Sequence, residues 1–355
     1  MTGGLDRIVV LAPNWLGDFV MALPAIGDLR RAHPGGRLAV AARPSLAPLV
    51  EAIPGVDEVI RLGSSGGWRS VGGLGTDAGR LREGAFDAAL VLPNSFHAAW
   101  IAWRAGIPRR WGYRADWRSR LLTTAVPKPR GRRLHQAEYY QHLTRALGLP
   151  AGPLRPRLSV GAASRERGLA LLGTRGWKGE RLVGLAPGAA YGSAKRWPPE
   201  RMGGLAARIA RTGARVVIVG AAADRPSAEA VRRAAEREGE GDALIELAGA
   251  TDLPSLLGVL GCCDVFVSND SGAMHLAAAV NVPVVGIFGP TREWATSPLA
   301  GGDADVFIVK TDVWCRPCML RTCPIDHRCM TRIGIDAVFA HVAGVLEHAG
   351  RGDRA

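Results

Sequence analysis

Three short polar segments contain residue types that could do acid–base chemistry or bind an anion. The first spans residues 12–18 (A-P-N-W-L-G-D) and ends on Asp18, soon after an apolar run. A carboxylate at this point could act as a general base, or it could cap the helix that follows, and its position alone leaves both roles open. The segment has no G-x-G-x-x-G pattern, which argues against a standard dinucleotide site.

The second segment spans residues 186–200 (A-P-G-A-A-Y-G-S-A-K-R-W-P-P-E) and combines small residues with two cations. Small side chains let backbone amides approach an anion, while Lys195 and Arg196 add positive charge, so the segment suits a diphosphate. It is not a Walker A loop, because G-x-x-x-x-G-K-[ST] is missing. The alternative is a flexible loop between domains with solvated cations.

The third segment spans residues 267–277 (V-S-N-D-S-G-A-M-H-L-A). Asp270 or Ser271 could cap the helix that begins there, which would leave the amides of Ser271 and Gly272 directed at a ligand. His275 follows about one turn later, where its ring could face the same ligand. For His275 taken alone, a side chain directed into the core is the favoured interpretation.

Two other turns are weaker candidates. Asp224 follows Val219 and Gly220, and an acid near the second strand of a nucleotide-binding fold can bond a ribose hydroxyl. The F-G-P-T sequence at residues 288–291 ends a later apolar run and could line the same site.

Four of the six cysteines form a C-x2-C-x4-C-x5-C pattern with His327 nearby. The pattern suggests a metal site, although its spacing is that of neither a zinc ribbon nor a zinc finger. A closely packed loop with reduced thiols is the favoured alternative, and the sequence leaves the purpose of the cluster open. Its members are Cys315, Cys318, Cys323 and Cys329.

Strands and helices must alternate to position these segments. Strands are predicted at 7–11, 38–42, 58–62, 88–92, 110–113, 182–186, 215–219, 244–247, 265–268 and 282–288. Helices are predicted at 19–32, 96–104, 200–211, 227–238, 253–261, 272–279 and 336–348. The alternation predicts parallel sheets covered on both faces. In such sheets ligands bind where strands end and helices begin, which is where the three segments lie.

The length of 355 residues, with 47% hydrophobic residues, predicts two domains. We place them at residues 1–165 and 180–355, with a linker of Pro- and Gly-punctuated sequence at about 155–180. No apolar stretch approaches 18 residues, and the N-terminus lacks the pattern of a signal peptide, so a cytoplasmic location is expected.

The charge is unevenly distributed. Residues 1–175 contain 25 Lys and Arg against 12 Asp and Glu, a surplus of 13, whereas residues 176–355 contain 20 of each. Ten basic residues and one acid lie between Arg104 and Arg133, interleaved with aromatic residues. Such a patch suits nucleic acid, an anionic membrane or a phosphorylated substrate. The alternative is a solvated face of an Arg-rich protein.

Together the motifs resemble glycosyltransferase family 9, the lipopolysaccharide heptosyltransferases. The resemblance rests on N-W-L-G-D, P-G-A-x-Y-G-x-A-K-R-W-P, N-D-S-G-x-M-H-L-A-A-A, F-G-P-T and C-x-P-C…C-P…C-M, in order over most of the chain. The second motif is most similar to that of members that add the second inner-core heptose. One departure is R-E-W at residues 292–294, where relatives often carry small or polar residues.

The resemblance implies a GT-B fold of two doubly wound Rossmann-like domains with a cleft between them. The C-terminal domain would bind ADP-heptose, and the N-terminal domain would bind a phosphorylated, heptosylated lipid A core at the inner face of the inner membrane. Transfer would invert the anomeric centre without metal or cofactor. Peripheral membrane contact is expected, and a nucleic-acid partner is not.

The resemblance also implies roles for individual residues. Asp18 would be the catalytic base, and Lys195 would hold the diphosphate and support its departure. The other donor-binding residues would be Gly188, Ala189, Tyr191, Asp224, Asp270, Ser271, Gly272 and His275. Arg114, Arg118 and Arg120 would contact the acceptor.

Two other functions stay open at this point. One is another two-domain sugar-nucleotide enzyme, such as an epimerase. The other is a non-catalytic binder of nucleic acid or anionic membrane, although the neutral second half with its ordered motifs argues against it.

Overall fold

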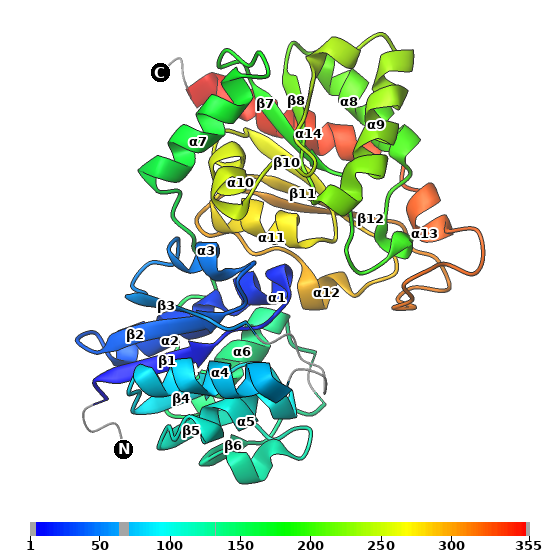
Figure 1. Cartoon of the computed structure of the whole chain (residues 1–355). Coiled ribbons are helices and arrows are strands. Elements are labelled where there is room, and N and C mark those ends of the chain that lie inside the picture. The colour runs from blue at the N-terminus through cyan, green and yellow to red at the C-terminus, as the bar shows by residue number, and fades with distance from the viewer. Residues whose placement is uncertain (1–4, 64–70, 132, 353–355) are drawn as a thin grey trace. The chain divides into compact units, whose positions relative to one another are not determined.

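The computed structural model describes residues 5–63, 71–131 and 133–352, and it divides the chain into two compact units (Figure 1). The N-terminal unit is Met1–Ser159, and the C-terminal unit is Val160–Ala355. Helix α7 (Ala162–Gly173) occupies much of the segment predicted as a linker. It belongs to the C-terminal unit, where it packs on α10 (Leu253–Leu260).

The N-terminal unit is built on a six-stranded parallel sheet in the order β3-β2-β1-β4-β5-β6. Its strands are β1 (Arg7–Leu11), β2 (Arg37–Ala42), β3 (Glu58–Arg61), β4 (Ala88–Val91), β5 (Arg109–Tyr113) and β6 (Thr124–Val126). The strand order reverses between β1 and β4, so the carboxyl ends of these two strands form the topological switch point.

Helices cover this first sheet. They are α1 (Leu16–Met21), α2 (Leu23–Ala32), α3 (Ala47–Val50), α4 (Val71–Glu83), α5 (Phe96–Arg104) and α6 (Gln136–Ala146), with a 3-10 turn η2 (Arg118–Leu121). The prediction of a single helix at 19–32 is wrong, because the structure has two helices there, separated at Ala22. Pro24 accounts for the break, since proline lacks an N–H and suits the first turn of a helix.

The C-terminal unit repeats the same plan with the order β12-β11-β10-β7-β8-β9, again fully parallel. Its strands are β7 (Leu182–Ala186), β8 (Arg215–Ile218), β9 (Leu244–Glu246), β10 (Val265–Asn269), β11 (Val284–Phe288) and β12 (Val306–Lys310). Renumbered within its own unit, each sheet has the order 3-2-1-4-5-6 of the Rossmann fold. The predicted doubly wound fold is therefore confirmed for both units.

Five helices of the C-terminal unit lie close to their predicted ranges, namely α8 (Pro199–Ala210), α9 (Arg225–Arg237), α10, α11 (Gly272–Ala279) and α14 (Ile335–Gly352). The short helices α12 (Glu293–Thr296) and α13 (Arg328–Thr331) were not predicted, and neither were the 3-10 turns η3 (Ser193–Lys195), η4 (Ala222–Asp224) and η5 (Gly241–Ala243). Strand β12 was not predicted. It lies at the edge of its sheet and is only half-buried, so its apolar signal is weak.

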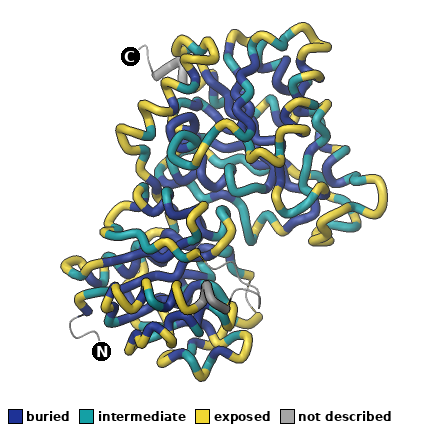
Figure 2. Tube along the Cα trace, viewed as in Figure 1, coloured by how far each residue is buried: buried dark blue, intermediate teal, exposed yellow. Residues whose placement is uncertain are grey.

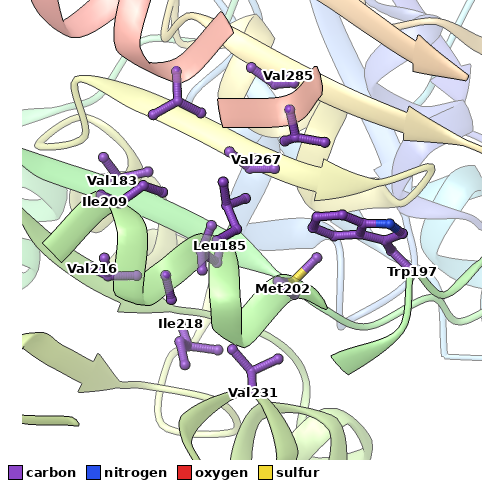
Figure 3. Close-up of a cluster of buried hydrophobic side chains, with 14 of the residues drawn as sticks. Val183, Leu185, Trp197, Met202, Ile209, Val216, Ile218, Val231, Val267 and Val285 are labelled. Atoms are coloured by element: carbon purple, nitrogen blue, oxygen red, sulfur yellow. The ribbon is translucent and has the colours of Figure 1, made fainter. Parts of the chain in front are cut away.

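Each unit has its own buried interior, as the dark segments of Figure 2 show. In the C-terminal unit, Val and Leu side chains of the central strands pack against α8 and Trp197 (Figure 3). The indole N–H of Trp197 donates to the Ile333 carbonyl at 3.1 Å, so this large buried side chain leaves no polar atom unpaired. Trp197 thereby anchors the loop after β7, which carries the second polar segment.

Across the described ranges 5–63, 71–131 and 133–352, no helix is both long enough and apolar enough to cross a bilayer.

Candidate functional site

The switch point of the C-terminal unit brings two of the predicted segments together. Lys195, in the loop after β7, places its Nζ 2.6 Å from Oδ2 of Asp270, the residue directly after β10. The two side chains are only 14% and 5% exposed, respectively. The carboxyl ends of β7 and β10 are adjacent because these strands pair at the centre of the sheet. Strand order therefore creates this ion pair between residues far apart in the sequence.

Thr291 completes the surroundings of the Asp270 carboxylate. Its hydroxyl donates to the same oxygen, Oδ2, at 2.7 Å, and it comes from the F-G-P-T segment after β11. Asp270 is thus held from two neighbouring strand ends and directs the Lys195 ammonium. An ammonium carries three donors, and the carboxylate occupies one of them. The arrangement can present a fixed positive charge to an anionic ligand.

Asn269 is a site residue that the sequence reasoning missed. Its side-chain amide donates to the Pro187 carbonyl at 2.8 Å, and its side-chain oxygen accepts from the Trp197 amide at 3.0 Å. It therefore ties the whole loop after β7 to the end of β10. Its place at the start of the N-D-S-G sequence could have marked Asn269 as a candidate. Its bonding partners lie more than 70 positions away in the sequence, so no local pattern predicted them.

The start of α11 differs from the predicted cap. Ser271 occupies the N-cap position with extended backbone, but its hydroxyl pairs with the Ser268 hydroxyl at 2.9 Å and makes no capping bond. Asp270 does not cap either, since it pairs with Lys195. The prediction of a side-chain cap is therefore wrong. Uncapped first-turn amides, including that of Gly272, are a common anion-binding feature.

His275 lies within α11 and is 4% exposed. The low exposure fits a side chain directed into the core, and the predicted contact of His275 with a donor stays a prediction.

Asp224 and Gly188 lie against each other at the ends of β8 and β7. A Cβ atom at position 188 would overlap the Asp224 carboxylate, so a larger residue there would have to displace this carboxylate. Asp224 also accepts a hydrogen bond from the Ala221 amide at 3.0 Å, which fixes the acid within η4. The half-buried Asp224 is thereby placed beside the loop that leads through the buried Ala189 to Tyr191 and Lys195. The ring of Tyr191 lies under the Lys195 ammonium, 4.8 Å from its centre.

The acid of the R-E-W sequence at residues 292–294 is held by ion pairs. Glu293 pairs with Lys310 at 2.5 Å and with Arg316 at 2.9 Å. Burial raises the pKa of Glu293, but the bond from Lys310 and the charge of Arg316 outweigh it and hold that pKa below its usual value. The acid is thus an ion-pair partner of two neighbouring cations.

In the N-terminal unit, Asp18 lies in the first turn of α1, while Trp15 occupies the N-cap position. Asp18 is therefore not the cap, which removes one of the two roles left open. The Tyr140 hydroxyl, from α6, donates to Asp18 Oδ1 at 3.4 Å. Burial, together with the negative charge of Asp18, raises the pKa of Tyr140, so this hydroxyl stays protonated and remains a donor. The half-buried Asp18 lies beyond the carboxyl end of β1, at the switch point of its sheet.

The prediction that Arg118 contacts the acceptor is wrong. Its side chain is fully buried in η2, and its guanidinium donates to the carbonyls of Tyr113 at 2.9 Å and Ser95 at 3.4 Å, and to that of Pro93. Burial lowers the pKa of Arg118 to about 10. A guanidinium engaged in this way is not presented to a ligand, so the predicted acceptor contact does not fit the structure. The other two predicted acceptor contacts, Arg114 and Arg120, are exposed.

All six cysteines are free thiols, with Cys318 exposed and Cys329 buried. In the part of the chain that the structure describes, no three His, Cys, Asp or Glu side chains are gathered to hold a metal ion.

Comparisons with known proteins agree with this architecture. A family model described as glycosyltransferase family 9 (heptosyltransferase) matches residues 78–328. Lipopolysaccharide heptosyltransferase 2 of Salmonella typhimurium is 33% identical over 302 residues, covering 83% of this chain and 86% of that relative. The Escherichia coli protein of the same name is 32% identical over the same shares of the two chains.

Solved structures agree as well. The structure of E. coli ADP-heptose LPS heptosyltransferase II superimposes with a TM-score of 0.84 at 28% identity, covering 97% of this chain and 99% of that one. A family 9 glycosyl transferase from Veillonella parvula gives a TM-score of 0.82 at 22% identity, covering 96% and 97%, and supports the fold. The predicted GT-B fold is confirmed, and the chain belongs to glycosyltransferase family 9, the heptosyltransferases, and is a glycosyltransferase.

Proposed function

We propose that this enzyme transfers heptose from ADP-heptose to the inner core of lipopolysaccharide, adding the second heptose. The observation that carries the proposal is the Lys195–Asp270 pair at the switch point of the C-terminal unit, 2.6 Å apart and largely buried. A fixed cation beside the uncapped start of α11 suits the diphosphate of a sugar nucleotide. The names of the relatives at 32–33% identity support transfer of heptose to lipopolysaccharide, and the name of the E. coli structure supports ADP-heptose as the donor.

The donor would bind along the ends of β7, β8 and β10. The diphosphate would lie against Lys195 and the amides of Ser271 and Gly272, and Asp224 is the proposed contact to the ribose. Gly188, Ala189 and Tyr191 would line the approach. We propose that Asp270, predicted as a donor contact, serves the donor by holding Lys195, and that the buried His275 supports α11.

In the proposed reaction, Asp18 takes the proton from the acceptor hydroxyl as that oxygen attacks C1 of the heptose. The bond from C1 to the diphosphate oxygen breaks on the opposite face, and its electron pair leaves with ADP. Lys195 stabilises the charge that develops on this leaving group. Attack opposite the departing group inverts the anomeric centre. The residues named supply base and charge stabilisation, so we propose that the reaction proceeds without metal or cofactor.

The acceptor would be a phosphorylated lipid A core that already carries one heptose. Arg114 and Arg120 are the proposed contacts to its phosphates, because both are exposed and charged. We further propose a cytoplasmic enzyme that contacts the inner face of the inner membrane through its basic N-terminal unit, without a nucleic-acid partner. Trp117 supports this proposal, since it is 96% exposed and is presented from a left-handed backbone conformation (φ +59°).

The experiment is a binding screen of ADP-, UDP- and GDP-sugars by calorimetry, followed by transfer from ADP-heptose to a heptosylated lipid A acceptor. We expect selective binding of ADP-sugars, one added heptose of inverted anomeric configuration by mass spectrometry and NMR, and turnover unchanged by a chelator. Sugar-nucleotide conversion without an acceptor would instead identify an epimerase, and binding of none of these nucleotides would remove the donor assignment.

The base assignment has its own test, the substitution Asp18→Asn. The amide keeps the size of the side chain but cannot accept the acceptor proton, so kcat should fall by roughly 10²- to 10⁴-fold while ADP affinity stays unchanged. Stopped-assay kinetics and calorimetry on the same preparation measure both. Turnover close to that of the unmodified enzyme would exclude Asp18 as the base.

A further inference from the structure

We propose that the cysteine-rich segment, residues 315–329, positions Lys195 for the donor diphosphate, with His327 as the positioning residue. This inference rests on the proposed donor role of Lys195. The sequence left the purpose of this segment open, and the proposed reaction uses none of its side chains.

The cysteine-rich segment makes three hydrogen bonds to the loop just before Lys195. His327 Nε2 lies 2.6 Å from the Ala194 carbonyl oxygen, and because a carbonyl only accepts, this nitrogen carries the proton and donates. The Ala194 amide donates to the Arg321 carbonyl at 3.0 Å. The Tyr191 hydroxyl donates to the Met319 carbonyl at 2.8 Å. Both polar backbone groups of the residue that precedes Lys195 are therefore held by this segment.

The same segment also holds the loop that bears Thr291. Arg316, only 7% exposed, donates from Nε to the Gly289 carbonyl at 2.5 Å and from Nη2 to the Thr291 carbonyl at 3.3 Å. The Met319 amide donates to the Pro290 carbonyl at 3.0 Å. Since Thr291 bonds Asp270, the cysteine-rich segment contacts the loops on both sides of the Lys195–Asp270 pair.

The contact with the Lys195 loop is close-packed. A Cβ atom at Gly192 would overlap the carbonyl of Arg321, so the two backbones touch. His327 adopts a left-handed backbone conformation (φ +56°), a sparsely populated state for a residue other than glycine. Three bonds and this close contact fix the backbone on which the Lys195 side chain is mounted. A cation fixed before the ligand arrives loses less conformational entropy on binding.

The test compares two substitutions of His327 in the full chain. His327→Phe keeps a flat ring but removes the Nε2 donor, whereas His327→Gln places an amide nitrogen at a similar reach. We expect His327→Phe to weaken ADP binding by roughly three- to tenfold in calorimetry, the usual worth of one hydrogen bond, and to raise donor KM more than it lowers kcat. His327→Gln should restore ADP affinity to within about twofold of the original.

A matched control removes a similar contact elsewhere. His348 Nδ1 lies 2.6 Å from the Gly344 carbonyl within α14, so His348→Phe loses a histidine–carbonyl bond remote from both loops. ADP affinity should be unchanged in this variant. Should His327→Phe fail to fold, His327→Asn replaces it, because asparagine tolerates the left-handed backbone while its shorter amide falls short of the Ala194 carbonyl.

Lys195→Met is measured in parallel to separate this inference from the proposed function. If Lys195→Met binds ADP normally, the donor role of Lys195 is wrong. If Lys195→Met weakens ADP binding but His327→Phe does not, the positioning role of His327 is overturned. Equal losses in His327→Phe and His327→Gln would also overturn it, because the carbonyl bond would then not be the cause.

Discussion

At the residue scale, Arg118 shows how little the sequence position of a cation says about its role. It lies in the most basic stretch of the chain, yet its guanidinium is buried against the backbone carbonyls of the β4–α5 loop and of Tyr113. The neighbouring Arg120 is exposed. The difference arises because a 3-10 turn has three residues per turn, so residues two positions apart point in different directions.

We therefore predict that Arg118→Leu destabilises the enzyme by about 2–4 kcal/mol, since it leaves buried carbonyls without donors. Arg120→Leu should change stability by less than about 0.5 kcal/mol, as expected for an exposed site. Urea unfolding measures both. If Arg118→Leu is as stable as the original enzyme but binds the acceptor more weakly, Arg118 contacts the acceptor and its structural role is overturned.

A second residue-scale prediction concerns thiol reactivity. Burial, followed by the neighbouring cysteines, raises the pKa of Cys329 to about 11, so this thiol stays protonated at pH 8. Because the thiolate is the reactive form, iodoacetamide at pH 8 should label the exposed Cys318 before Cys329, and labelling of Cys329 should accelerate towards pH 11. Peptide mass spectrometry with the unfolded chain as control measures the order. Equal rates at Cys318 and Cys329 in the folded enzyme would contradict it.

At the element scale, α7 is fastened to α10 through paired glycines. A Cβ atom at Gly258 would overlap the Ser164 carbonyl, and one at Gly168 would overlap the backbone of Gly258. Two helix backbones can approach this closely only where side chains are absent. Helix α7 begins just after the boundary between the units, so this contact secures the entry of the chain into the C-terminal unit.

Gly258→Ala should therefore destabilise the C-terminal unit by about 1–3 kcal/mol, because the added methyl group forces the helices apart. Gly173→Ala, at the exposed end of α7 with open space around it, should be neutral or stabilise by up to about 1 kcal/mol. Thermal unfolding of the two variants provides the comparison. Similar melting temperatures for both would show that the α7–α10 contact can relax.

At the scale of the whole molecule, the charge asymmetry is the feature most relevant to membrane contact. The surplus of 13 positive charges lies entirely within residues 1–175. After β5 the chain presents Trp117, and after the neighbouring β6 it presents the exposed Lys128 and Arg130. Parallel neighbouring strands end at the same edge of their sheet, so these residues follow one edge of the N-terminal unit.

We predict that the enzyme binds vesicles containing phosphatidylglycerol, with affinity that falls as salt rises, and binds pure phosphatidylcholine weakly. The double substitution Lys128→Gln with Arg130→Gln should weaken binding by roughly tenfold or more, at about 1 kcal/mol per charge. Arg175→Gln with Lys178→Gln removes two exposed charges from the C-terminal unit and serves as the control. Sedimentation with vesicles measures all three, and equal losses in both double variants would argue against a membrane face on the N-terminal unit.

The sequence by itself determined the alternation of strands and helices, the two Rossmann-like units and the places where Asp18, Lys195 and Asp270 follow strands. These features depend on local periodicity and turn residues, which act within a few positions of the chain. Two strands were not predicted. Strand β6 has only three residues, and strand β12 is only half-buried, so the hydrophobic pattern of each is too weak to identify it.

Only the tertiary structure decided which of these residues meet and how they are engaged. The pairing of Lys195 with Asp270 depends on β7 lying beside β10, and the burial of Arg118 depends on η2 packing on α5. The contacts of His327 with Ala194 join residues 133 positions apart. Strand order and the packing of distant segments determine such pairings. A local sequence pattern cannot predict them, because it describes only residues a few positions apart.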